Sequence, residues 1–117
     1  MRGLIGKLAR TAAFALMICG APLHASSQEI GDPRHGYVFA SAHCTECHAI
    51  DPNNLNSPNP KAPSFTSVAK SSGMTGRALA VWLDSTHPTM PNFVLRTSDR
   101  DDVVAYIMSL KDVPAPK

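Results

Sequence analysis

The segment Cys44-Thr45-Glu46-Cys47-His48 brings two cysteines and a histidine together within five residues. Residues 34–43 precede it without a proline, and Gly36, Ala40 and Cys44 recur at four-residue intervals, which predicts a helix that ends at the segment. Cysteines three positions apart at a helix end lie on one face, and a histidine beside the second can reach beneath the same ligand. The segment is therefore suited to hold one flat ligand from one side.

This pattern suits haem. Each thiol can add to one vinyl group of the porphyrin, while the neighbouring imidazole binds the iron. We therefore predict one covalently attached haem c at Cys44 and Cys47, with His48 as an axial ligand of the iron.

Other uses of a Cys-x-x-Cys pair fit this sequence less well. A structural zinc site needs four ligands, and no second cysteine pair or close histidine pair follows. A redox disulfide of the thioredoxin type would open a helix after a strand, and no strand pattern precedes Cys44. A structural disulfide between the two cysteines would close a very short loop and stabilise little.

The N-terminal residues indicate export. Arg2, Lys7 and Arg10 precede an apolar run over residues 11–21, and the small-residue stretch Leu23-His24-Ala25 follows it. This predicts a signal peptide over residues 1–25, with an uncleaved anchor as the alternative. The run is too short to span a bilayer, and no second one follows, so the mature chain is expected to have no membrane span. Covalent haem attachment takes place outside the cytoplasmic membrane, so the predicted location is the periplasm.

Size and charge restrict what the mature chain can be. Cleavage would leave residues 26–117 as one small domain with a limited core, which a bound cofactor can supplement. The net charge of +2 includes the three N-terminal basic residues, and without them eight basic residues face nine acidic ones. No electrostatic footprint for nucleic acid is present.

The middle of the chain alternates loops and helices. Residues 51–63 carry four prolines and four asparagines, which excludes a helix or a central strand. Residues 64–69 are expected to form a turn of helix. Thr75 is a plausible N-cap for a helix through Asp84, in which Leu79, Trp82 and Leu83 share one face and Trp82 is expected in the core.

The last helix is expected to open at Ser98, which forms a capping-box pattern with Asp101. Its core face follows at helical spacing and consists of Val103, Tyr106, Ile107 and Leu110, and Pro114 ends the helix. No strand alternation is seen, so the predicted class is all-α with long loops.

Together these residues resemble the class I c-type cytochromes, particularly the small single-haem periplasmic proteins of bacteria. The resemblance implies three main helices with long loops around one haem. It also places Gly36, eight positions before Cys44, where the first helix crosses the last one at Tyr106. Mitochondrial members carry an aromatic residue at the position of Ala40, and here Phe39 is expected to supply the ring.

The resemblance further implies the surroundings of the iron. Pro63 matches the proline whose carbonyl accepts a hydrogen bond from the histidine ligand, and Met90, in a proline-flanked loop, matches the methionine ligand. His87 is the competing sixth ligand, while Met74 and Met108 are weaker candidates. The expected function is one-electron transfer without enzymatic activity, between redox partners such as a dehydrogenase, an oxidase or a reductase. The alternatives are a haem enzyme or gas-binding sensor with an open iron, and a thiol or zinc protein without haem.

Overall fold

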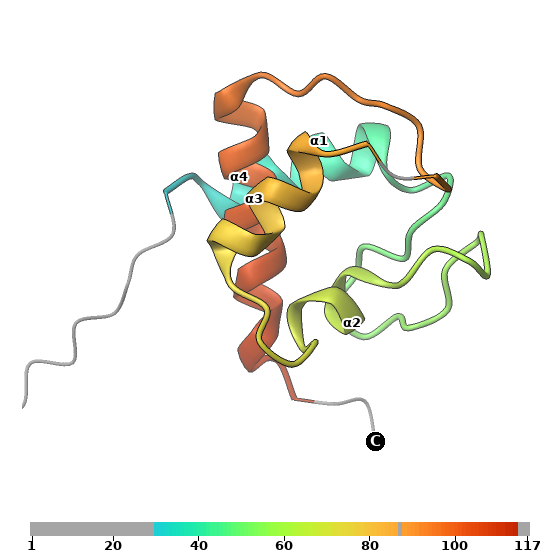
Figure 1. Ribbon diagram of the computed structural model, residues 1–117. Coiled ribbons are helices and arrows are strands. Elements are labelled where there is room, and N and C mark those ends of the chain that lie inside the picture. Colours follow the sequence, from blue (N-terminus) through green and yellow to red (C-terminus); the bar gives the residue numbers. More distant parts are fainter. Residues whose placement is uncertain (1–29, 87, 115–117) are drawn as a thin grey trace, which may run out of the picture.

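The computed structural model describes residues 30–86 and 88–114. Within these ranges the chain is helical and has no β-strand, which confirms the predicted all-α class. The elements are α1 (Pro33–His43), α2 (Phe65–Ala69), α3 (Gly76–Asp84), α4 (Thr97–Ser109) and the short 3-10 helix η1 (Leu110–Asp112). Three main helices were expected, and the short α2 lies where a turn of helix was predicted. Long loops join the helices on the side opposite the crossing of α1 and α4 (Figure 1).

Helices α1 and α4 cross at Gly36, as predicted (Figure 1). A Cβ atom at Gly36 would lie 2.8 Å from the Cβ atom of Tyr106 and would also clash with the backbone carbonyl of Asp102. Only glycine lets the two backbones approach this closely. Near the same crossing, the Asp102 carboxylate accepts a 2.7 Å hydrogen bond from the backbone N–H of Asp32 and holds the start of α1 on α4.

The core lies along α4. Val103, Tyr106, Ile107 and Leu110 are all buried, which confirms the predicted helical stripe. The hydroxyl of Tyr106 donates a 2.7 Å hydrogen bond to the Ile50 carbonyl. This bond satisfies a buried backbone acceptor and joins α4 to the segment that follows His48.

The starts of two helices agree with the predictions from the sequence, and the start of a third differs from its prediction. Ser64 caps α2, and Thr75 caps α3 as predicted, each by accepting a hydrogen bond from a backbone N–H. The predicted capping box of α4 is wrong. The helix begins at Thr97, before Ser98, and the Arg96 guanidinium pairs with the Asp99 carboxylate at 2.7 Å, so an ion pair occupies the first turn.

The predicted positions of two aromatic side chains are also wrong. Trp82 is not a core residue, because 57% of its surface is exposed. The ring of α1 that packs on Tyr106 is that of Tyr37, in an edge-on contact with 5.3 Å between the ring centroids. Phe39 instead contacts His43 in a tilted arrangement, with 4.5 Å between the ring centroids, and packs against the core.

Candidate functional site

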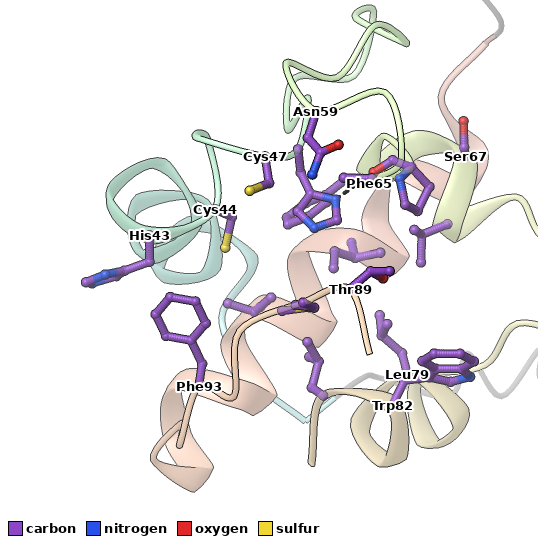
Figure 2. Close-up of a pocket in the computed structure, with 18 of the residues that line it drawn as sticks. His43, Cys44, Cys47, Asn59, Phe65, Ser67, Leu79, Trp82, Thr89 and Phe93 are labelled. Carbon is purple, nitrogen blue, oxygen red and sulfur yellow. Dashed lines mark hydrogen bonds between the residues drawn. The ribbon is translucent and has the colours of Figure 1, made fainter. Parts of the chain in front are cut away.

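A cavity opens between the Cys44–His48 segment, helices α2, α3 and α4, and the loop after α3. It encloses about 430 Å³, within the range of about 300–1,000 Å³ that is usual for ligand and cofactor pockets. Its walls are mainly apolar, with Phe39, Phe65, Trp82 and Phe93 among the lining rings. Figure 2 shows the sulfur atoms of Cys44 and Cys47 on one side of this cavity and Leu79 and Trp82, from α3, on the other.

The two cysteines follow α1 directly. The backbone N–H groups of Cys47 and His48 both bond the Cys44 carbonyl, at 3.2 and 2.9 Å, so a tight turn continues the helix end. No disulfide joins the two cysteines, and both line the cavity. The predicted same-face placement of the pair is therefore confirmed.

The pKa of Cys44 bears on the alternative that the chain is a thiol protein without haem. Burial, with a smaller effect of the neighbouring Cys47, raises the pKa of Cys44 to about 11. Catalytic redox cysteines have the opposite property, with pKa values lowered to about 3.5–7.5. The apolar surroundings of Cys44 are therefore unsuited to thiol–disulfide exchange at neutral pH.

The zinc alternative also lacks support in the part of the chain that the structure describes. No group of three or more histidine, cysteine, aspartate or glutamate side chains converges there. A structural zinc ion needs four such ligands.

His48 is fixed in orientation by a residue 15 positions away. Its Nδ1 atom lies 2.7 Å from the Pro63 carbonyl oxygen, which confirms the hydrogen bond predicted for that proline. A carbonyl oxygen can only accept, so Nδ1 carries the proton and Nε2 keeps its lone pair free for a metal. The Phe65 ring packs against the imidazole, with 5.5 Å between the centroids.

Backbone hydrogen bonds hold the proline-rich loop in place to make this contact. The N–H of Phe65 donates to the Ala49 carbonyl at 2.9 Å, and the N–H of Asn59 donates to the Cys47 carbonyl at 3.2 Å. The Ser57 hydroxyl accepts from the N–H of Ala49 at 3.1 Å. The loop is therefore ordered against the cysteine segment, and the Pro63 carbonyl has a defined position.

Met90 lines the same cavity from the loop between α3 and α4, and its side chain is half-buried. The ends of this loop are tied together, because the Arg100 guanidinium bonds the Asp84 carboxylate at 2.7 Å. Among the weaker methionine candidates, Met74 also lines the cavity, whereas Met108 packs on the core. The competing His87 lies outside the described residues.

Sequence reasoning missed Phe65, which packs on His48 and is 95% buried. A large apolar residue directly after the proline-rich loop was the available signal. The overall donor set suits haem, because two thiols, an oriented imidazole and a thioether share one mainly apolar cavity.

Comparison with known proteins agrees with this donor set. The family model described as Cytochrome c matches residues 34–111. The chain belongs to the cytochrome c family. A similar protein is cytochrome c-552 of Bradyrhizobium diazoefficiens, which is 36% identical over 86 residues that cover 74% of this chain and 82% of that protein. No solved structure matches significantly.

Membership settles the class of cofactor and the general function. This cytochrome binds haem c covalently, its Cys44 and Cys47 fit the attachment motif, and it transfers electrons between redox partners. Within residues 30–86 and 88–114, none of the helices has the length and apolar character that crossing a bilayer requires.

Proposed function

We propose that this chain is an exported one-electron carrier of a periplasmic respiratory or dehydrogenase chain. In this proposal the haem is joined to Cys44 and Cys47, and its iron is held by His48 and Met90. The observation that carries it is the single cavity that all four side chains line, with His48 already oriented by Pro63.

The haem supplies reversible one-electron chemistry at its iron. The protein's part is to hold the ligands still and to set the balance between the two oxidation states. The hydrogen bond from Nδ1 to Pro63 fixes the ring of His48 and raises its basicity. The apolar walls disfavour positive charge, so they favour the reduced iron, which carries one charge fewer.

Met90 would supply the second protein ligand of the iron. A neutral thioether opposite an imidazole favours reduced iron and raises the potential. If His48 and Met90 both held the iron, no position on it would be left open to a small molecule, which would suit a carrier without enzymatic activity. The open-iron alternative, a haem enzyme or a gas sensor, requires Met90 to stay away from the iron.

Residues 1–25, which lie outside the described residues, are proposed to be a cleaved signal peptide that leaves 26–117 as the haem domain. The partners are proposed to be a dehydrogenase, an oxidase or a reductase.

Carbon monoxide tests the carrier proposal, because it binds reduced iron only where a position is open. The reduced wild-type protein should bind it slowly. Rapid binding would support the open-iron alternative. The mass of protein released from the periplasm tests export: a chain starting at Ser26 is expected, and a membrane-retained chain with residues 1–25 would contradict cleavage.

A further inference from the structure

The loop that carries Met90 buries little of its own surface. It covers residues 85–96, and it runs out from the end of α3 and returns to the start of α4 (Figure 1). Every described residue of the loop except Met90 and Leu95 is exposed, and Val94 is 98% exposed. A segment with so few buried side chains opens at a low free energy. The position of Met90 therefore depends on how the two ends of the loop are held.

A single arginine joins these two ends. Arg100 lies near the start of α4, and its Nη1 atom is 2.7 Å from Oδ2 of Asp84, the last residue of α3. Its Nη2 atom is 2.8 Å from Oδ1 of Asp101, on α4 itself. Only 23% of the Arg100 side chain is exposed. Asp101 thus holds the guanidinium on α4, and the same guanidinium reaches across to α3.

The position of Asp84 is not explained by the helix to which it belongs. A carboxylate at the last residue of α3 faces the negative end of the helix dipole, which is unfavourable. Arg100 is likewise close to the positive end of α4. The contact between the two side chains offsets both effects. The pairing therefore points to a role between the helices, where the loop begins and ends.

We propose that Asp84 and Arg100 are positioning residues for the sixth iron ligand, because their ion pair holds the ends of the loop so that Met90 stays on the iron. This rests on the proposed function, in which Met90 is that ligand. When the ion pair opens, the ends of the loop separate more easily and Met90 leaves the iron more often. The ion pair thus sets the fraction of protein with an open iron.

Salt gives this role a specific signature. The Asp84 side chain is 52% exposed, so dissolved ions screen its attraction to Arg100. The fraction of protein with an open iron is therefore expected to rise with ionic strength. A loop held only by apolar contacts would not respond in this way.

The test measures how fast carbon monoxide binds to the reduced holoprotein at a fixed gas concentration, because the gas reaches the iron only after Met90 has left. Asp84→Ala should raise this rate about two- to fivefold, the factor expected for a partly exposed ion pair. The wild-type rate should rise with salt, and the rate of Asp84→Ala should be nearly independent of salt. Asp84→Glu keeps the carboxylate and should restore most of the wild-type behaviour.

The chain offers a matched control at the same helix start. Arg96 pairs with Asp99 at 2.7 Å, but both residues lie at the α4 end of the loop, so their ion pair does not join the two ends. Arg96→Gln should leave the carbon monoxide rate and its salt dependence as in the wild type. An equal increase in Arg96→Gln and Asp84→Ala would assign the effect to the start of α4 in general and would overturn the proposal.

A second measurement follows the loop without reference to the iron. The backbone N–H of Phe93 donates to the Pro91 carbonyl at 2.9 Å, within the loop. Its hydrogen exchange in the holoprotein should be faster in Asp84→Ala than in the wild type and unchanged in Arg96→Gln. Unfolding by denaturant should change little in Asp84→Ala, because this substitution also removes an unfavourable charge from the end of α3.

Two kinds of failure can be told apart. An unchanged carbon monoxide rate in Asp84→Ala, or a salt dependence that persists in this variant, overturns the role of the ion pair while the wild type keeps its absorption band of sulfur bound to iron. Absence of that band from the oxidised wild type would instead refute ligation by Met90, and the role of the ion pair would fall with it.

Discussion

The Nδ1 atom of His48 lies 2.7 Å from the carbonyl oxygen of Pro63, although 15 positions separate the two residues. This contact depends on the loop between them, which folds back through backbone hydrogen bonds onto Cys47 and Ala49. Its effect is to present Nε2, without a proton, toward the cavity. A flat cofactor attached next to His48 therefore meets a ligand that is already in the correct tautomer.

Covalent attachment is the first property to test. Replacing Cys44 and Cys47 by alanine should abolish the retention of haem through acid and organic extraction, because both thioether bonds are lost. The exported double variant is compared with the wild type by absorption of the extracted protein. Haem that stays with the double variant would show that the attachment lies elsewhere.

The helix crossing predicts a large effect at Gly36. Gly36→Leu places a side chain against the Asp102 backbone and Tyr106, so it should destabilise the fold by about 3 kcal/mol, the upper end of typical overpacking costs. The exposed Ala42, on the same helix, is the matched control, and Ala42→Leu should change the free energy of unfolding by no more than about 0.5 kcal/mol. Denaturant unfolding of both holoproteins measures the difference, and equal effects would contradict the crossing.

The raised pKa of Tyr106 predicts that the free energy of unfolding depends on pH in alkaline solution. Burial, with smaller effects of Asp51 and Tyr37, raises the pKa of Tyr106 to about 12 from an ordinary value of 10. As the pH rises, Tyr106 therefore loses its proton in the unfolded state before it does so in the folded state. The stabilisation that Tyr106 gives to the fold is complete below pH 10 and disappears as the pH rises through 12. The stability difference between wild type and Tyr106→Phe should therefore shrink from pH 9 to pH 12. A difference that stays constant over this range would contradict the shift.

Local sequence signals predicted much of this fold. The spacing of Gly36 and the Cys44–His48 segment placed the first helix and the attachment motif, and Thr75 was correctly identified as a cap. The contact between His48 and Pro63 followed from the family resemblance. In each case a short stretch of chain, or a known pattern, determines the geometry.

The wrong predictions concern features that depend on tertiary contacts. Helical spacing cannot distinguish a side chain in the core from one on a cavity wall, and Trp82 lies on the wall. Ser98 does not cap α4 as expected, and an ion pair between Arg96 and Asp99 occupies the first turn instead. Which ring of α1 meets Tyr106 depends on the rotation of the helix about its axis, and that rotation places Tyr37 there.

The most direct test of the account concerns the sixth iron ligand. The oxidised wild type should show the weak long-wavelength absorption band of sulfur bound to iron, and Met90→Ala should lack the band, bind carbon monoxide readily once reduced, and have a lower potential. Met74→Ala, which changes another methionine of the same cavity, and His87→Ala should keep the band. Loss of the band in Met74→Ala with its retention in Met90→Ala, or opening of the iron by His87→Ala alone, would contradict ligation by His48 and Met90.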